Sequence, residues 1–340
     1  MQKTEKLKKY IALAIVLILL AIFSCSKEES NREILIPEFD FPKTVVFEDS
    51  ISSYEIFEGT PSNLSPTKDF QLLELSSVLF TDFSYKQRLV KIPEGTLMSN
   101  SGNEMIEFPN GTILTKTFFY YNDERDTTLG KRIIETRLEI KENDIWNVAT
   151  YVWNQNQTEA ILELEGFDTS ISWIDEYGVS RSTLYHVPNE NECMTCHQSN
   201  STMTPLGPTL INLNRDVDRN GTTLNQLTHL QNVGMLNIFP VSQIGQMVNY
   251  NDLNTTLEER GRAYLAMNCA HCHNPYSWER SAEREFDFRY GTPIEEASIL
   301  YEEEKIQRAL QDMEMPLIGT TMLDHDGVNL ITEYLDSLRE

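Results

Sequence analysis

The stretches Cys193-Met194-Thr195-Cys196-His197 and Cys269-Ala270-His271-Cys272-His273 each contain two cysteines three positions apart, followed at once by a histidine. With 5 cysteines and 6 histidines among 340 residues, a C-x-x-C-H match arises by chance roughly once in a thousand such chains. Two matches therefore indicate a shared chemistry, and this pattern is the one at which c-type haem is attached covalently. We expect two haem c groups, with attachment at Cys193, Cys196, Cys269 and Cys272 and with His197 and His273 as iron ligands.

The spacing within each motif suits this attachment, because two cysteines three apart lie on one face of a helical turn and can reach neighbouring vinyl groups of one porphyrin. A zinc site made of all four cysteines is the first alternative. Its pairs should be about 15 to 20 residues apart, as in a zinc ribbon, whereas 72 residues separate Cys196 from Cys269. A thioredoxin-type redox pair does not require the histidine, and a disulfide within C-x-x-C is strained.

The beginning of the chain predicts export from the cytoplasm. Four lysines precede an apolar run over residues 11–23, which is too short to span a bilayer comfortably. The run leads into Ile22-Phe23-Ser24-Cys25, which resembles the lipobox of bacterial lipoproteins, where the cysteine becomes acylated. We expect a signal peptide over 1–24, lipidation at Cys25, a tether over 25–41 and an outer membrane lipoprotein facing the periplasm or the cell surface. An uncleaved membrane anchor is the alternative.

The negative charge of the chain indicates which kinds of partner molecule it can bind. The sequence has 28 Lys and Arg against 52 Asp and Glu, for a formal net charge of −24. A surface of this sign repels the phosphates of nucleic acid, so we expect no nucleic-acid partner. Acidic surfaces steer association with basic ones, and the expected partners are therefore redox proteins, a donor and an acceptor, with a basic docking patch.

The region from residue 42 to 184 predicts β-structure. Residues 134–141 alternate between apolar and charged side chains, which is typical of a half-buried strand with a charged outer face. A turn over 142–144 leads to a second alternating stretch over 146–152, and residues 112–121 indicate another long strand. Strands of this kind, separated by regular turns, predict an antiparallel β-sandwich.

The remaining chain predicts helices, divided into a first haem unit over 185–255 and a second, cytochrome c-like unit over 256–340. Thr256 and Glu259 form a capping box for a helix that runs toward the second motif. Thr292-Pro293 predicts a helix through about Leu310, and the apolar residues between Val328 and Leu338 have helical spacing. The expected fold class is α+β multidomain, an N-terminal β-sandwich followed by an all-α cytochrome c-like dihaem region.

The iron ligated by His273 needs a second ligand from the opposite side of its porphyrin. Met315, followed by Pro316, lies 42 residues further on and just before the last predicted helix. Met/His ligation is the usual choice in cytochromes c, so Met315 is the predicted ligand. Met313 and Met322 are its rivals, and each of these methionines could equally fill a gap in the core.

For the iron ligated by His197 we expect Met247 as the distal ligand, with Met235 and His229 as alternatives. An iron without a sixth ligand would instead permit catalysis. Gly207-Pro208-Thr209-Leu210 resembles the Gly-Pro-x-Leu segment of cytochromes c, in which the proline carbonyl accepts a hydrogen bond from the proximal imidazole. That resemblance implies that Pro208 orients His197 and contributes to cofactor binding.

Taken together, segments along the whole mature chain resemble a family of mostly uncharacterised bacterial dihaem c-type cytochromes. The resemblance implies a haem-binding, electron-transferring protein with an N-terminal extension, and it implies no substrate. The matching segments are Phe41-Pro42-Lys43, 79–84, 116–120, 134–138, 151–154, Val187-Pro188-Asn189, Gly207-Pro208, 212–216, Asn225-Gln226-Leu227, 262–265 and 268–273.

The expected function is therefore that of an exported dihaem cytochrome c that carries electrons in the periplasm or at the outer membrane. Two alternatives stay open. One is a dihaem peroxidase or oxidase in which one iron is open to substrate. The other is a surface protein whose β-rich region binds a ligand while the haems connect it to an electron-transfer chain.

Overall fold

The computed structural model describes residues 38–102, 105–200, 202–219, 221–277, 286–316 and 318–339. Residues 36–340 cluster into one compact unit, and the description below concerns this unit. The predicted signal peptide and Cys25 lie outside the described residues. Among the helices of the described part, none is both long and apolar enough to cross a bilayer.

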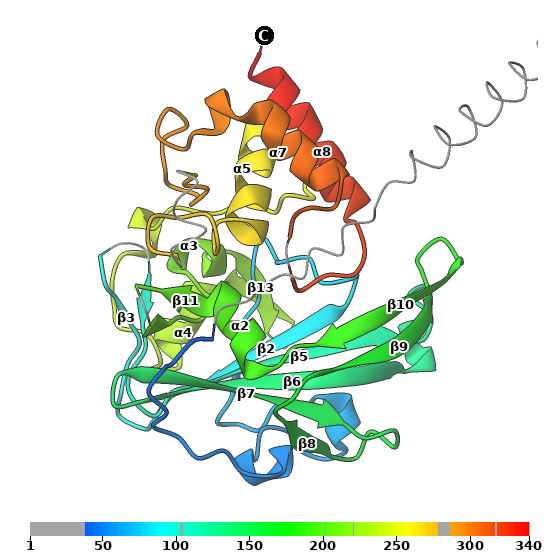
Figure 1. Ribbon diagram of the computed structural model, residues 1–340. Coiled ribbons are helices and arrows are strands. Elements are labelled where there is room, and N and C mark those ends of the chain that lie inside the picture. Colours follow the sequence, from blue (N-terminus) through cyan, green and yellow to red (C-terminus); the bar gives the residue numbers. More distant parts are fainter. Residues whose placement is uncertain are drawn as a thin grey trace, which may run out of the picture. The chain divides into compact units, whose positions relative to one another are not determined.

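A six-stranded antiparallel sheet occupies the centre of this unit (Figure 1). The three strands that the sequence predicts most clearly are confirmed as β5, β6 and β7, and the turn between β6 and β7 has Asn143 and Asp144 at φ 54° and 63°. In spatial order the strands are β1 (Gln71–Leu72), β2 (Tyr85–Lys91), β5 (Ile113–Tyr121), β6 (Lys131–Glu142), β7 (Ile145–Trp153) and β8 (Ala160–Glu163).

The other strands pair two by two in small antiparallel sheets. These pairs are β3 (Ser99–Asn100) with β4 (Ile106–Glu107), β9 (Phe167–Ile174) with β10 (Ser180–Val187), β11 (Gln198–Ser199) with β12 (Thr202–Met203), and β13 (Asp216–Arg219) with β14 (Thr222–Asn225).

The α-helices of the described residues all come from the second half of the chain. They are α2 (Glu190–His197), α3 (Leu210–Leu213), α4 (Gln226–Asn232), α5 (Leu257–Asn268), α7 (Glu303–Gln311) and α8 (His325–Ser337). Short 3-10 turns lie at Ile51–Tyr54, Pro61–Asn63, Thr127–Leu129, Val241–Gln243 and Ile299–Tyr301.

Both faces of the six-stranded sheet are covered. On one face, residues from 51 to 70 pack against inward side chains such as Leu138 and Tyr151. On the opposite face, Val90 and Leu114 share a core with apolar residues of α3 and α4. Because the strands are buried on both sides, they are stabilised by apolar burial from two separate cores rather than from one.

The predicted fold class is wrong in two respects. The first is the sandwich: the N-terminal region forms one large sheet with small hairpins, and its second layer comes from the downstream chain. The second is the all-α haem region, because the described residues after the first motif include β11, β12, β13 and β14. The helix predicted from Thr292 begins at Glu303, since a 3-10 turn precedes it. The structure is mostly β, with helices added.

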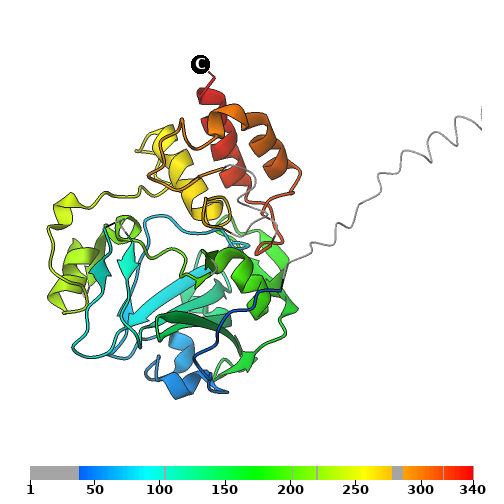
Figure 2. The same cartoon turned by 60° about the vertical axis from the view of Figure 1, so that its left-hand side comes forward.

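Helices α5, α7 and α8 pack together beside the sheet (Figure 2). The capping box of Thr256 and Glu259 is confirmed at the start of α5. Where α5 crosses α8, two glycines face two tyrosine rings: a Cβ at Gly261 would lie 2.5 Å from Tyr334, and one at Gly327 would lie 2.2 Å from Tyr264. The crossing therefore leaves no space for a side chain at either glycine.

We predict that Gly261→Ala will destabilise the protein by about 1–3 kcal/mol, because its methyl group would overlap the Tyr334 ring in a closely packed interface. Urea unfolding measures the change. Gly291→Ala is the matched control, since nothing lies within 4 Å of its added Cβ. Equal stability of the two variants would show that α5 and α8 do not cross as closely as described.

Candidate functional site

The first C-x-x-C-H motif forms helix α2, which begins with a capping box between Asn189 and Glu192. The helix lies against strand β7, and Cys193 packs in a small core with Val148 of that strand, together with Met194 and Met203. The motif is therefore held on the central sheet, and its first cysteine is buried with 5 % of its surface exposed.

The second motif follows directly after α5. The amide of His273 donates to the carbonyl of Cys269 at 2.9 Å, and so does the amide of Cys272 at 3.1 Å, so the motif forms a tight turn. The His273 ring lies beside a pair of aromatic residues that contact each other, with centroid distances of 5.6 Å to Phe286 and 5.4 Å to Phe288. This histidine thus lies in an apolar, aromatic environment.

The structure brings the two motifs together although they are far apart in sequence. The donor atoms of Cys196, His271 and Cys272 all lie within 4.8 Å of one another, and the Cys272 sulfur is 3.8 Å from the Thr195 carbonyl oxygen. Hydrogen bonding from Cys272, together with the nearby His271, lowers the pKa of the Cys196 thiol well below its usual value. All four motif cysteines are free thiols in the structure.

The imidazole of His197 is held in one orientation. Its Nδ1 is 3.1 Å from the carbonyl oxygen of Thr204, and because a carbonyl can only accept, Nδ1 carries the proton and donates. Burial lowers the pKa of His197 to about 3. The ring is therefore neutral with a lone pair on Nε2, which is the form that ligates a metal.

The carbonyl that fixes His197 belongs to Thr204 rather than to the predicted Pro208, which lies four residues further on, just before α3. The sequence offered no signal for Thr204, because a backbone carbonyl carries no residue-type information. The side chain of Glu139 is also close, with 3.5 Å between a carboxylate oxygen and His197 Nδ1.

The sheet face next to α2 is charged and buried, although the alternation in residues 134–141 predicts an outer face in water. Glu135 of β6 is fully buried, where it pairs with Arg137 at 2.6 and 2.9 Å and accepts a hydrogen bond of 2.6 Å from the Tyr185 hydroxyl. Burial raises the pKa of Glu139 to about 7. Charges in such a location are costly unless they are paired.

The candidate distal ligands of the first motif lie in different surroundings. Met247 is buried in the core that also contains Ile211 and Tyr250. Met235 belongs to the core beside α4, and His229 on α4 has its Nε2 at 3.2 Å from the side-chain oxygen of Gln71. The core of Met247 also contains Ala270 of the second motif and the rings of Phe286 and Phe288, so its assignment to the first motif stays a prediction.

The candidates for the second motif lie between α7 and α8. Met315 is half-buried, whereas Met313 is 54 % exposed. Met322 packs against the core that contains Tyr120 and Trp173, and its amide donates to the buried carboxylate of Asp82 at 2.9 Å. Met315 thus lies in the segment between α7 and α8, and hydrogen bonds to Asp82 hold the Thr321–Met322 end of that segment.

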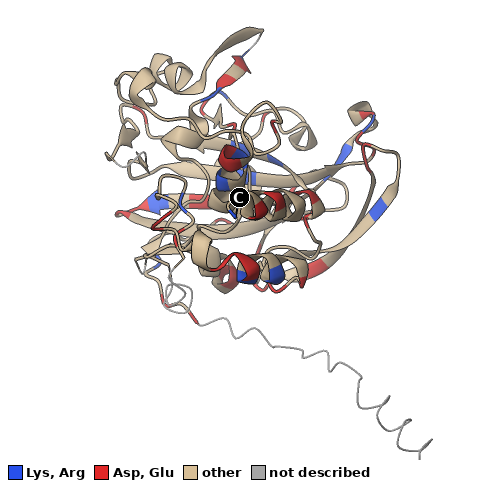
Figure 3. Ribbon diagram, turned by 90° about the horizontal axis from the view of Figure 1, so that it is seen from above, with Lys and Arg blue, Asp and Glu red and all other residues tan. Residues whose placement is uncertain are grey.

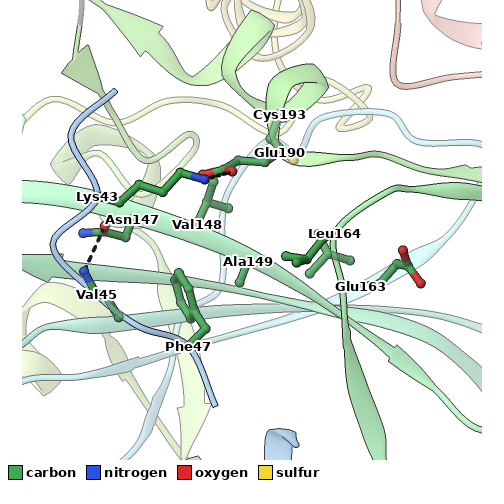
Figure 4. A pocket seen from close by; sticks show the side chains of 11 residues that line it. Lys43, Val45, Phe47, Asn147, Val148, Ala149, Glu163, Leu164, Glu190 and Cys193 are labelled. Carbon is green, nitrogen blue, oxygen red and sulfur yellow. Dashed lines mark hydrogen bonds and ion pairs between the residues drawn. The ribbon is translucent and has the colours of Figure 1, made fainter. Parts of the chain in front are cut away.

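A pocket reaches the first motif from the side of strand β7 (Figure 4). Lys43 and Glu190 form an ion pair across it at 2.5 Å, and Asn147 accepts from the backbone amide of Val45 at 3.3 Å. Cys193 lines this pocket, but neither motif histidine does. The pocket therefore borders the first motif, and its lining does not include the expected iron ligands.

Comparisons with known proteins add no relative: no family model, no curated protein and no solved structure matches this chain.

We predict that Asp82→Asn will loosen the segment that follows Met315. The Asp82 carboxylate accepts from the Thr321 amide at 2.8 Å, from the Thr321 hydroxyl at 2.8 Å and from the Met322 amide at 2.9 Å. Hydrogen bonds to a charged group contribute about 1.5–3 kcal/mol, so the variant should unfold at lower urea and exchange these two amides faster. The exposed Asp312→Asn is the control, and unchanged exchange in Asp82→Asn would contradict the assigned contact.

Proposed function

We propose that the protein is a dihaem c-type cytochrome that carries electrons, with one haem c attached at each C-x-x-C-H motif. The observation that supports this proposal most is the arrangement of the motifs, which are 72 residues apart in sequence and have Cys196 and Cys272 as neighbours in space. Two attachment sites that adjoin suit the passage of an electron from one group to the other.

The residues present fit the proposed group. Cys193 and Cys196 would hold the first haem, and Cys269 and Cys272 the second, each through thioether bonds formed when a thiol adds across a vinyl group. His197 is already neutral and oriented by Thr204, and His273 lies against aromatic rings that would exclude water. When bound, haem c would supply an iron that gains and loses one electron at a potential set by its ligands and surroundings.

A metal ion is a second candidate, because the same geometry offers nitrogen and sulfur donors. Cys196, His271 and Cys272 lie within 4.8 Å of one another, and this donor set is one that zinc accepts. In that case Cys193 and Cys269 would have no role as ligands, and the histidines that close both motifs would be unexplained. The haem assignment uses all six motif residues.

The proposed location and partners follow from the sequence. We propose a lipid-anchored protein at the outer membrane that exchanges electrons with partners bearing a basic patch. Figure 3 shows acidic stretches on the helices around the C terminus, including Glu303 and Glu304 of α7 and Asp326 of α8. Association through such charges weakens as ionic strength rises.

We predict that the full chain, matured with a c-type haem assembly system, carries two haems per molecule by intact mass and absorbance. Cys193→Ala with Cys196→Ala should reduce the number to one, and so should Cys269→Ala with Cys272→Ala. The buried Met203→Leu serves as control and should keep both. A colourless wild-type protein that contains zinc would refute the haem proposal and support the metal alternative.

We predict that Met247→Ala and Met315→Ala each remove the distal ligand of one haem. Loss of a thioether ligand lowers the potential of the affected iron and opens it to small molecules. The ferrous variant should then bind carbon monoxide at one haem, whereas wild type should bind none. Binding of carbon monoxide by wild type would favour the peroxidase or oxidase alternative, and Met235→Ala is the control from a neighbouring core.

A further inference from the structure

Three basic side chains form a row across three neighbouring strands of the central sheet. Arg88 of β2 is directly opposite Lys116 of β5, and Lys116 is directly opposite Arg137 of β6. Side chains in such positions lie on the same face with Cβ atoms about 4.5–5.5 Å apart, and like charges there repel. A row of three cations is therefore unfavourable unless an anion compensates for it.

Acidic residues on this face compensate for only part of the charge. Arg137 is paired with Glu135. Within the described residues, neither Arg88 nor Lys116 has an ion pair with a carboxylate, and Arg88 Nε is buried without a hydrogen-bond partner. Lys116 contacts the Phe118 ring, with its nitrogen 5.4 Å from the centroid.

Burial also disfavours the charge on both of these side chains. It lowers the pKa of Lys116 to about 8 and that of Arg88 to about 10. A fourth cation, Lys86, donates to the carbonyls of Leu79 and Ser84 at 2.9 and 3.2 Å. These four cations lie on the same face as Glu135 and Glu139, and Glu163 of β8 lies at the end of the row, beyond Thr150.

The row lies next to the first motif. The neighbouring row on the same face contains Leu114, Glu139 and Val148. Val148 packs against Cys193, and Glu139 is 3.5 Å from His197 Nδ1. The row of cations is thus one step of strand register away from residues that contact the motif.

Haem c carries two propionate side chains, each ending in a carboxylate. Burying a carboxylate is costly unless a cation pairs with it, and Arg and Lys form the strongest such contacts. We propose that Arg88 and Lys116 bind the propionates of the haem attached at Cys193 and Cys196. This proposal rests on the proposed function. The β-rich region then has a defined role, as one wall of the first haem site.

This assignment predicts an effect on the potential of one haem. The oxidised iron carries one more positive charge than the reduced iron, so a nearby cation disfavours oxidation. Removing either cation should therefore lower the midpoint potential of the first haem and leave the second unchanged. We expect the equilibrium constant for reduction to fall at least threefold. At 59 mV per tenfold change for a one-electron couple, the midpoint potential would then be lower by about 28 mV.

The test uses the full haem-loaded chain with Lys116→Met and, independently, Arg88→Met. Lys91→Met is the matched control, because Lys91 is on β2 but lies beside the Phe70 ring on the opposite face of the sheet. Spectroelectrochemistry gives the two potentials, and resonance Raman gives the propionate bending band. The potential of the first haem and the propionate band should both shift in Lys116→Met and in Arg88→Met. Neither should shift in Lys91→Met, and Lys116→Arg, which keeps the positive charge, should have the wild-type values.

Each other outcome overturns the assignment. If both haems are attached but neither the potential nor the propionate band moves, these cations do not bind propionate, and the proposed function still holds. If malonate shifts the wild-type potential saturably, at an ionic strength matched with chloride, and Lys116→Met abolishes this shift, the row binds a free dicarboxylate instead. If wild type holds no haem, the proposed function fails and this assignment fails with it.

Discussion

The contact between helix α2 and strand β7 is the constraint on which the rest of the site depends. It buries Cys193 against Val148 and places His197 where the Thr204 carbonyl fixes its ring. It also brings the motif onto a sheet face that carries buried charge. On the helix held in this way, Cys196 lies within 4.8 Å of Cys272 of the second motif.

The two covered faces of the sheet differ in the side chains that they bury. The face toward residues 51–70 is an apolar core and stabilises the fold through burial. The opposite face is apolar under α3 and α4 and at Val148 under α2, and it also carries the row of Arg88, Lys116 and Arg137. Buried charged groups cluster at functional sites, and this is the basis of our proposal that this face forms one wall of the first haem site.

Local sequence patterns predicted the local structure well. The strands β5 to β7, the turn at Asn143 and Asp144 and the capping box of Thr256 all follow from short-range rules, and all three are present. The long-range arrangement could not be predicted in this way. Charged residues that alternate along β6 normally face water, but here the downstream chain covers them, and no local signal reveals a cover that comes from 50 residues later.

The candidate site shows the same limit. The two motifs can be recognised from residue type and spacing, so their cysteines and histidines could be predicted from the sequence. The row of cations depends on strand register, which the residue types do not reveal. The role of Thr204 depends on its backbone carbonyl, which every residue has. The 72 residues between Cys196 and Cys269 favour separate cysteine sites, yet Cys196 and Cys272 are neighbours, because folding makes sequence separation a poor guide to distance.

Anomalous X-ray scattering from crystals of the matured protein, recorded at the iron and zinc absorption edges, tests the central claim most directly. The account predicts two iron peaks, one beside His197 and one beside His273, and none at the zinc edge. A single zinc peak between Cys196, His271 and Cys272, with no iron, would contradict it.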